Sequence, residues 1–423
     1  MFFVQSSIQE PHLTAATHKV STTGEHETHA LKSMPQGLTL LLAAACGIIV
    51  ANIYYSQPLA GPIGQALGLS TSATGLIVTL TQIGYGVGLL FVVPLGDLIE
   101  TRRLALSVLA INFVALLAAA SAKHTLTFLL GSLAIGVSST AVQVLVPYAA
   151  HLAPVHQRGR VVGTVTSGLL IGVMLSRPTA SLIDDRWGWP AVFYFAAALM
   201  GVIGTALALT LKPMHPKAGE PYFALLASMA RLVRTTPVLR RRALYQALQF
   251  GAYSLFWTTS PLLLAGPLFH LSQRGIAVFA FLGVAGACAA PLAGHLADRG
   301  WGQTATGLAM AAVLGGFVLT RILHGGSTAA LVMLTAGAIL LDFGVSASMV
   351  IGLRAIYTLG AAYRSRLNAL FMATFFAGGG VGSAVGAWPY ARGGWELASW
   401  FGMAGPAVAL AYFATEKMGH KKA

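Results

Sequence analysis

The sequence predicts an all-α membrane protein whose twelve transmembrane helices form two six-helix bundles, with both termini in the cytoplasm. Three observations lead to this fold class. Charged residues make up only 9% of the 423 positions, whereas soluble domains carry about 25%. Hydrophobic residues make up 56%, and the mean hydropathy is +0.73. The chain also divides at polar, glycine and proline positions into twelve apolar runs, each close to the ~20 residues that a helix needs to cross a bilayer.

Residues 1–36 precede the first apolar run and are polar, with scattered His, Thr and Ser. No basic segment leads directly into an apolar stretch, as a signal peptide requires. We therefore expect a disordered cytoplasmic tail, and we expect a protein that begins at Met34 to insert and transport normally. His26 and His29 have a spacing that could bind a metal ion, or they are simply solvated.

The apolar runs are divided six and six by the longest internal connection. The N-terminal bundle, 37–211, has its spans at 38–57, 73–95, 104–121, 127–149, 161–182 and 190–211. The C-terminal bundle, 243–415, has its spans at 243–264, 275–296, 303–322, 329–352, 367–388 and 395–415. The connection, 212–242, contains PYFALLASMARLVRT, whose apolar and basic residues separate well enough to predict a short amphipathic helix on the inner membrane surface. Residues 416–423 form a cytoplasmic C-terminal tail.

The distribution of Lys and Arg predicts the orientation in the membrane. The N-terminal tail, the even-numbered loops and the C-terminus carry nineteen of these residues, and the odd-numbered loops carry five. Because basic residues favour the cytoplasmic side of short loops, both termini are expected in the cytoplasm. The net charge of +14 is therefore topological. The basic residues are not gathered on one face or motif, as they are in nucleic-acid-binding proteins, so no nucleic-acid partner is expected.

Several classes of function lack their sequence signals. The two cysteines, Cys46 and Cys288, lie inside apolar runs, which fits packing rather than a disulfide framework or a zinc site. No Gly-x-x-x-x-Gly-Lys-Ser/Thr loop is present, so ATP is not expected to drive the protein directly. The histidines lie in the tail, the loops or the span ends, which leaves no cluster for a membrane-embedded enzyme. A channel would need a selectivity filter or a ring of charged residues, and the sequence supports neither. No metal or other cofactor is expected.

A short pattern recurs at matching places in the two halves. The loop after the second run reads PLGDLIETRR (94–103), and the loop after the eighth reads AGHLADRG (293–300). Glycine permits a tight turn, while Asp and Arg can bond a neighbouring helix end in one conformation and release it in another. The pattern predicts a cytoplasmic gate, in which Asp97 and Asp298 govern switching rather than substrate affinity. The candidate gate residues are Asp97, Arg102, Arg103, Gly294, Asp298 and Arg299.

This repeat resembles the major facilitator superfamily over residues 37–415. The stretches ANIYYSQPL, LVPYAAHLAP, RGRVVGTVTSGLLIG and RSRLNALFMATFFAGGGVGSA are similar to one bacterial branch that is associated with drug or metabolite efflux. Two features depart from proton-coupled relatives: Ser176 and Arg177 replace a Gly-Pro pair in run five, and Ser132 replaces an arginine in run four. The resemblance implies alternating access around a central cavity lined by runs one, four, seven and ten.

Run seven gives an independent indication of such a cavity. Gln246, Gln249, Tyr253, Trp257 and Ser260 are spaced three, four, four and three residues apart, so they share one helical face. In lipid this face must meet protein or water, so it lines a substrate cavity or forms a hydrogen-bonding seam between helices. Tyrosines near a span end can equally be interfacial anchors. The remaining cavity candidates, in runs one and four, are Asn52, Tyr55 and Gln143.

Charged residues deep inside the apolar runs reduce to Asp342 and Arg177. At 1.5 Å per residue, Asp342 lies about 20 Å from the outer start of its run, and Arg177 lies about 24 Å from the inner start of its run. Their depths then differ by about a dozen ångströms, so a direct ion pair is not expected, and Arg177 can snorkel outward.

An ionised carboxylate at the centre of a membrane helix costs about 2.5–3.5 kcal/mol, and loss of water favours its neutral form. Asp342 can hold a proton while its surroundings are dry and release it when the cavity opens to water. That behaviour predicts a proton-coupling site at Asp342, with Arg177 as the second candidate. The alternative is a structural aspartate fixed by hydrogen bonds to neighbouring helices, including the backbone near Gly344.

The expected function is secondary active transport by a monomer in the cytoplasmic membrane. We expect the export of a small organic compound, a drug or metabolite, in exchange for protons. Proton symport or passive uniport of a metabolite is the nearest alternative, and a membrane-embedded enzyme or channel is a remote one. The partners are the small-molecule substrate, protons and the lipid bilayer. Amide and aromatic side chains suit many compounds, so the substrate is not identified.

Overall fold

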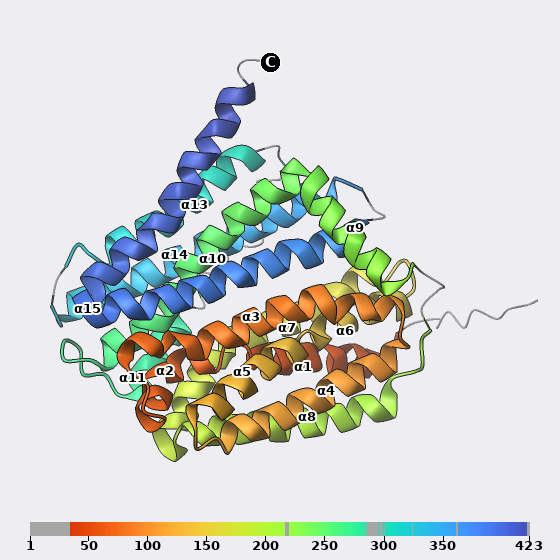
Figure 1. Cartoon of the computed structure of the whole chain (residues 1–423), viewed down its shortest axis with the longest axis horizontal. Helices are drawn as coiled ribbons and strands as arrows, with labels where there is room; N and C mark the ends of the chain where they lie inside the picture. The colour runs from red at the N-terminus through yellow and green to blue at the C-terminus, as the bar shows by residue number, and fades with distance from the viewer. Residues whose placement is uncertain are drawn as a thin grey trace, which may run out of the picture.

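The fold is known from a computed structural model (Figure 1), in which every regular element of the described residues is a helix. Nine of the described helices are long and apolar enough to cross a membrane. The predicted all-α fold class is confirmed. The described residues are 34–215, 220–283, 285, 295, 299, 301–323, 325–360 and 363–420.

The first half of the chain forms one helical bundle, closed by contacts of α1 with α7, of α3 with α5 and of α4 with α8. Two predicted spans are interrupted: the turn at 52–55 separates α1 from α2, and Thr140 separates α5 from α6. Short 3-10 turns flank α3 as η1 (Thr71–Ala73) and η2 (Val93–Asp97). The helices are α1 (Gln36–Ala51), α2 (Ser56–Ala66), α3 (Gly75–Phe91), α4 (Thr101–Ala120), α5 (Thr125–Ser139), α6 (Ala141–Leu152), α7 (Arg158–Trp187) and α8 (Trp189–Thr210).

The second half forms another bundle, in which α10 packs along α15 and α13 packs along α14. The range of α15 contains the last two predicted spans as two helices, separated by a kink at Gly393 and Gly394, where Gly394 has φ +60°. Such a backbone favours glycine. The elements are α9 (Tyr222–Thr235), which lies in the connection, and α10 (Pro237–Ala265), α11 (Gln273–Gly283), α13 (Gly302–Leu319), α14 (Thr328–Tyr357) and α15 (Arg364–His420).

Some predictions concern residues outside the described part of the chain. The predicted tail up to residue 33 belongs there, with His26 and His29, and so does most of the predicted eighth span after α11. Cys288 and two gate candidates, Gly294 and Asp298, fall in the same interval.

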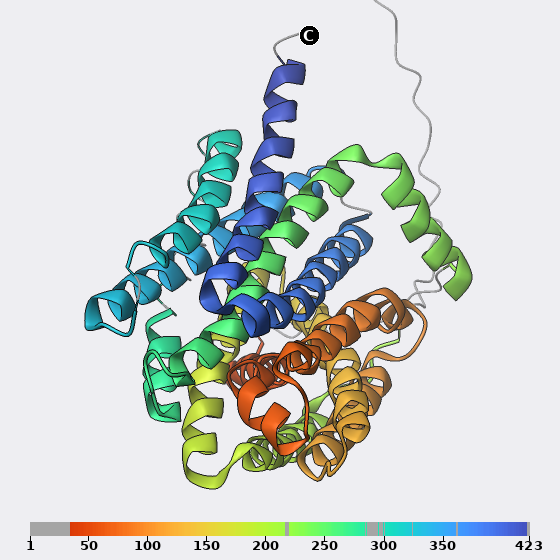
Figure 2. The same cartoon turned by 60° about the vertical axis from the view of Figure 1, so that its left-hand side comes forward.

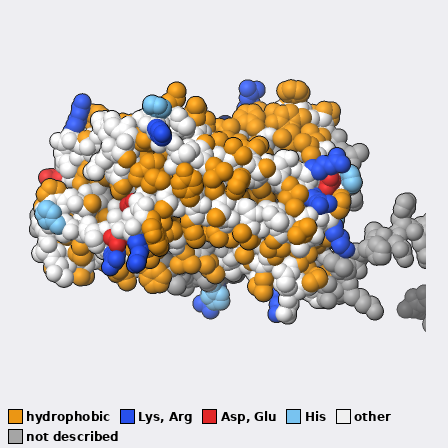
Figure 3. Space-filling model, turned by 90° about the horizontal axis from the view of Figure 1, so that it is seen from below, with side chains coloured by type: hydrophobic (Ala, Val, Ile, Leu, Met, Phe, Trp, Pro, Cys, Tyr) orange, Lys and Arg blue, Asp and Glu red, His pale blue; other side chains and the backbone are white. Residues whose placement is uncertain are grey.

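The helices alternate in direction, so the molecule has two ends. The terminal face carries Met34, α9 and the end of α15, where Arg242 pairs with Glu416 at 3.0 Å. The opposite face carries the turns between α1/α2 and α3 and between α10 and α11. There Arg274 pairs with Asp185 at 2.6 Å and joins the two halves. Figure 2 shows the last turns of α15 projecting beyond the bundle. Figure 3 shows a broad apolar band across the middle of one side, with most Lys and Arg toward the two ends.

The two bundles meet along α3 and α15, and this contact is tighter near the opposite face. A Cβ added to Gly75 would lie 2.2 Å from the carbonyl oxygen of Ser383. Farther along α3, toward the terminal face, a Cβ added to Gly86 would lie 3.4 Å from the carbonyl oxygen of Ala373. Since real side chains do not approach as closely as 2.2 Å, the conformation seen here depends on glycine at position 75.

Buried hydrogen bonds cross the same seam. The Gln82 amide of α3 donates to Ser254 Oγ of α10 at 2.8 Å, and Ser254 Oγ lies 2.6 Å from Ser383 Oγ of α15. All three side chains are completely buried. The bundles are therefore joined at mid-height by polar contacts that water does not reach.

Candidate functional site

A cavity of about 170 Å³ lies between the two bundles. Its lining comes from α1, α3, α6 and α7 of the first half and from α10, α14 and α15 of the second half. Most of the wall is apolar or aromatic. The side chains with charge or hydrogen-bonding capacity are Tyr54, Tyr85, Gln143, Arg177, Tyr253, Asp342 and Ser346.

Arg177 of α7 is held inside the protein, with only 4% of its surface exposed. Its Nε donates to Gln57 Oε1 at 2.7 Å, and its Nη2 donates to the Tyr253 hydroxyl. The guanidinium also lies 4.4 Å from the ring centroid of Trp257 and 5.3 Å from those of Tyr54 and Tyr253. Each ring presents a negative π-face to the cation. Arg177 therefore does not snorkel out of the bundle; its charge is stabilised by an aromatic cage.

Asp342 of α14 meets the same cage at the indole N–H of Trp257. The indole Nε1 donates to Asp342 Oδ1 at 2.9 Å. Trp257 thus contacts Arg177 through its ring face and Asp342 through its N–H. The depths estimated from the sequence had set the two charges apart, whereas here they line one cavity and are linked through a single indole.

Within the described residues, no hydrogen bond links the Asp342 side chain to the backbone near Gly344; the bond that holds it comes from Trp257 of the neighbouring α10. Gly344 packs on α13, where an added Cβ would lie 2.5 Å from the carbonyl oxygen of Ala309.

Two polar atoms of this pair lack partners. Within the described part of the chain, neither Nη1 of Arg177 nor Oδ2 of Asp342 has a hydrogen-bond partner. Both residues line the cavity. A ligand in the cavity can therefore bond to either atom, since polar groups in a dry site are costly unless they are paired.

The other candidates on α10 divide between the cavity and the second bundle. Tyr253 lines the cavity, and Trp257 links the two charged residues. Gln246 donates to the backbone oxygen of Val345 at 3.3 Å, which fixes α10 to α14. Gln249 is completely buried, and its amide has no partner among the described residues.

The candidates from the first bundle are also distributed. Gln143 lines the cavity and donates to the Tyr85 hydroxyl at 3.2 Å. Asn52 donates to Asn112 Oδ1 of α4 at 2.9 Å, inside the first bundle. Tyr55 is buried away from the cavity lining, while its neighbour Tyr54 lines it. The turn at 52–55 rotates Asn52, Tyr54 and Tyr55 relative to their places on a continuous helix. Helical spacing alone therefore does not predict which of these residues lines the cavity.

The gate candidates lie at the terminal face. Asp97 ends η2 in a small cleft that it shares with Arg366 of α15 and Met229 of α9. Arg102 donates from Nη2 to the backbone oxygen of Ala208 at 2.7 Å. The remaining described candidates, both exposed, are Arg103, which pairs with Glu100 at 3.0 Å, and Arg299.

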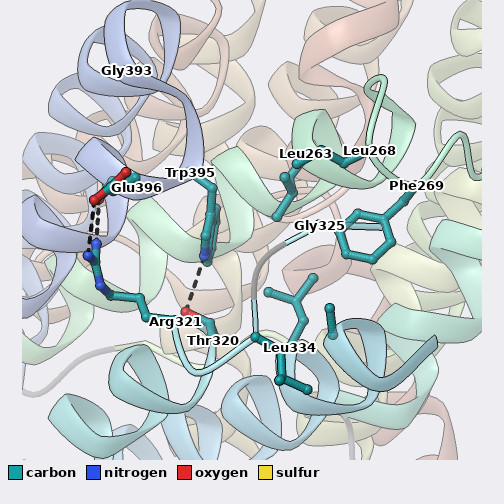
Figure 4. Close-up of a pocket in the computed structure, with 12 residues that line it drawn as sticks. Leu263, Leu268, Phe269, Thr320, Arg321, Gly325, Leu334, Gly393, Trp395 and Glu396 are labelled. Carbon is teal, nitrogen blue, oxygen red and sulfur yellow. Dashed lines mark hydrogen bonds and ion pairs between the residues drawn. The ribbon is translucent and has the colours of Figure 1, made fainter. Parts of the chain in front are cut away.

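A second cavity, of about 280 Å³, lies at the opposite face within the second half (Figure 4). Arg321 at its edge pairs with Glu396 at 3.3 Å and donates to Ser399 Oγ at 2.9 Å. The Trp395 indole donates to Thr320 Oγ1 at 3.2 Å. The polar groups drawn in Figure 4 therefore satisfy one another and leave little for a ligand.

Comparisons with known proteins agree with this architecture. A family model described as Major Facilitator Superfamily matches residues 40–359. The uncharacterized transporter YgaY of Escherichia coli O157:H7 is 37% identical over 358 residues, which cover 85% of this chain and 90% of that protein. The probable transporter SCO4007 of Streptomyces coelicolor is 34% identical over 359 residues, which cover 84% of this chain and 82% of that protein.

A solved structure shares the fold. It is an inward-facing, occupied form of a bacterial homolog of the human lysosomal transporter Spinster, with a TM-score of 0.70 and 14% identity, covering 90% of this chain and 96% of that one. The chain is therefore a multi-pass membrane protein and a transporter rather than an enzyme. Family model, sequence relatives and fold lead to one assignment: this chain belongs to the Major Facilitator Superfamily.

Proposed function

We propose that this chain moves a small organic compound across the membrane by alternating access and that Asp342 couples the movement to protons. One observation carries the proposal: Asp342 lines the cavity between the two bundles, with Oδ2 unpartnered in the described chain, and Trp257 links it to Arg177. A carboxylate so placed can exchange a proton with water whenever one end of the cavity opens. Perturbed ionisable groups of this kind are typical of functional sites in membrane proteins.

Export of the compound in exchange for protons is the direction that the resemblance to an efflux branch favours. The aromatic and methionine side chains of the cavity suit a drug or an apolar metabolite. A second candidate, co-transport of the compound with a proton, is favoured by Arg177. Arg177 is a fixed cation in the cavity, and an ionised Asp342 balances its charge. When Asp342 is protonated, the site has a net positive charge.

The moving parts are the two bundles, 37–211 and 243–415, with the connection 212–242 as a tether between them. Asp97 and Asp298 belong to the terminal-face gate, so Asp298→Asn is expected to slow exchange while substrate binding stays nearly unchanged. The excess of Lys and Arg in the tail and even-numbered loops supports a cytoplasmic location for the terminal face. A reporter that is active only outside the cytoplasm, fused after His420, is expected to be silent.

Proteoliposomes with an imposed pH gradient test the proposal. A panel of compounds is followed into and out of the vesicles for the wild type, for Asp342→Asn and for Glu396→Gln. The last variant removes a carboxylate at the opposite face, outside the central cavity. Gradient-driven accumulation is expected for the wild type and Glu396→Gln and not for Asp342→Asn. Accumulation by Asp342→Asn with ordinary pH dependence would rule out this residue as the coupling group.

A further inference from the structure

We infer that the transported compound is an organic anion with one acidic head group and an apolar body, and that one proton on Asp342 travels with it. This inference rests on the proposed function and names the substrate class of the same site. It selects co-transport of the compound and the proton over exchange.

The head group is recognised by the two unpartnered atoms. Nη1 of Arg177 carries N–H donors, and Oδ2 of Asp342 becomes an O–H donor once the acid is protonated. Both atoms are without partners in the described chain, and both residues line the cavity. An oxyanion such as a carboxylate or sulfonate can accept from both at once. Bonds from a guanidinium to an oxyanion are among the stronger hydrogen bonds in proteins.

The guanidinium is fixed before the ligand arrives. Gln57 and the Tyr253 hydroxyl accept from Nε and Nη2, and three rings surround the cation. These contacts satisfy the inner part of Arg177 and leave Nη1 as the remaining donor position. A preorganised donor loses little conformational entropy when it binds an anion.

The rest of the cavity suits an apolar body. Phe250 stacks on Phe375 with ring centroids 3.6 Å apart, and Phe376 packs edge-on against both. Met349 and Met372 complete this side of the wall. Aromatic and methionine side chains adapt to flat apolar ligands, so the expected compound has an aromatic or branched apolar part beside its acidic group.

Charge balance explains why a proton accompanies the anion. The described lining holds one fixed cation, Arg177, and one carboxylic acid, Asp342. The other ionisable groups there are the phenols of Tyr54, Tyr85 and Tyr253, which are neutral near pH 7. From α11, Gly283 faces this group: a Cβ added to it would lie 3.8 Å from Asp342 Oδ2, and glycine has no side chain to charge.

Two forms of the site have no net charge. One is empty with Asp342 ionised, and the other holds an anion with Asp342 protonated. A protonated empty site, or an anion beside an ionised Asp342, would carry a net charge into a dry cavity. Desolvation makes such closure unfavourable. The readily closing forms are therefore the empty transporter and the transporter loaded with one anion and one proton.

Other substrate classes fit the charges less well. An organic cation would place a second positive charge beside Arg177. The three rings that surround Arg177 already contact one cation. A neutral compound could close with Asp342 ionised and would carry no proton. Only an anion needs the proton to balance Arg177.

Binding to the purified full-length chain in detergent tests the inference with three probes of one shape: benzenesulfonate, benzenesulfonamide and phenyltrimethylammonium. Naphthalene-1-sulfonate extends the series to a larger ring. The sulfonates and the ammonium keep their charge at every pH used, so any pH dependence belongs to the protein. We expect a sulfonate to bind at acidic pH, with an affinity that falls by up to about tenfold per pH unit as Asp342 ionises. The neutral and cationic probes are not expected to compete.

Three variants identify the groups. Asp342→Asn keeps a neutral N–H donor and cannot ionise, so its sulfonate affinity is expected to be the same at acidic and alkaline pH. Arg177→Gln is expected to weaken sulfonate binding at acidic pH by at least about tenfold. Glu396→Gln is the control, and it is expected to keep the wild-type profile.

Preferential binding of the ammonium probe, a pH-independent sulfonate affinity in the wild type, or no binding of either sulfonate would overturn the anion inference. Failure of the proposed function has a separate signature. In that case neither a pH gradient nor Asp342→Asn would affect transport of any compound of the panel by proteoliposomes.

Discussion

Two of the arginines that lie over tryptophan rings, Arg321 and Arg177, each have an acid nearby, and they differ in how completely their hydrogen-bonding groups are paired. Arg321 lies 4.6 Å from the ring centroid of Trp400 and pairs directly with Glu396 at 3.3 Å. Arg177 lies 4.4 Å from the ring centroid of Trp257, whose N–H donates to Asp342 at 2.9 Å. The first group is at the opposite face, and the second is in the central cavity.

The two pairs, Arg321 with Glu396 and Arg177 with Asp342, show how a structural charge can be distinguished from a functional one. The Glu396 side chain is 70% exposed, and exposed ion pairs contribute about 0–1 kcal/mol. Arg177 is buried, Asp342 is half-buried at the cavity wall, and no ion pair joins them, an arrangement that is costly for folding unless a ligand or proton completes it. Incomplete pairing in a dry cavity therefore indicates function more strongly than the residue types do.

The largest expected effect is at Asp342. Asp342→Asn keeps the hydrogen bond from Trp257 but cannot ionise, so accumulation against a gradient is expected to disappear while energy-independent exchange persists. Counterflow and gradient-driven uptake in the same vesicles separate the two activities. Loss of both, in a protein that remains folded by gel filtration, would assign the residue a structural role instead.

Arg177→Gln is expected to have the next largest effect, reducing transport by about 100-fold, because it leaves the cage without its cation and Asp342 without a compensating charge. Arg177→Lys preserves the charge but not the planar fork, and it is expected to recover only part of the rate. Initial rates of uptake at several pH values give both numbers. If Arg177→Gln transports at the wild-type rate, Arg177 has a structural role like that of Arg321.

Trp257→Phe is expected to slow transport by about tenfold. The change keeps an aromatic face for Arg177 and removes the N–H that donates to Asp342, a hydrogen bond to a charged group worth about 1.5–3 kcal/mol. Because this bond acts directly on the carboxylate, its loss is expected to change the pH dependence of transport. An unshifted profile would show that the indole N–H does not act on Asp342.

Arg321→Gln is expected to have the smallest effect. Its ion pair is partly exposed, so the free energy of unfolding is expected to fall by no more than about 1 kcal/mol. Transport is expected to stay within about twofold of the wild type, since the residue is outside the central cavity. Thermal unfolding and uptake rates measure the two quantities, and a severe transport defect would remove the contrast between the two arginines.

Much of the fold follows from the sequence, because hydrophobic runs and their spacing are local properties. The runs at 161–182 and 190–211, for example, correspond to α7 and α8. The breaks within the first and fourth spans were not predicted, since neither the turn at 52–55 nor Thr140 interrupts the apolar pattern strongly. The final two spans are predicted as separate runs, and the backbone is non-helical between them, at Gly393 and Gly394.

The site was harder to predict because it depends on contacts between distant segments. Spacing on α10 placed Tyr253 and Trp257 on one face, and both take part in the cage. It could not show that Gln57, from α2, would accept from Arg177. Nor could rise per residue foresee that Arg177 and Asp342 meet on one indole, since long side chains and tilted helices close differences in depth. Unpaired charge in two separate spans was the available signal.

The close contact at Gly75 means that one added carbon atom can shift the equilibrium between the conformations of the transport cycle. A methyl group there would collide with the backbone of α15 in the form described here, in which the opposite face is tightly closed. Gly75→Ala would act as a wedge that penalises this form and leaves the central cavity chemistry unchanged. Such a variant can favour the conformations in which the opposite face is open, so that their structures can be determined without a ligand, an antibody or a cross-link.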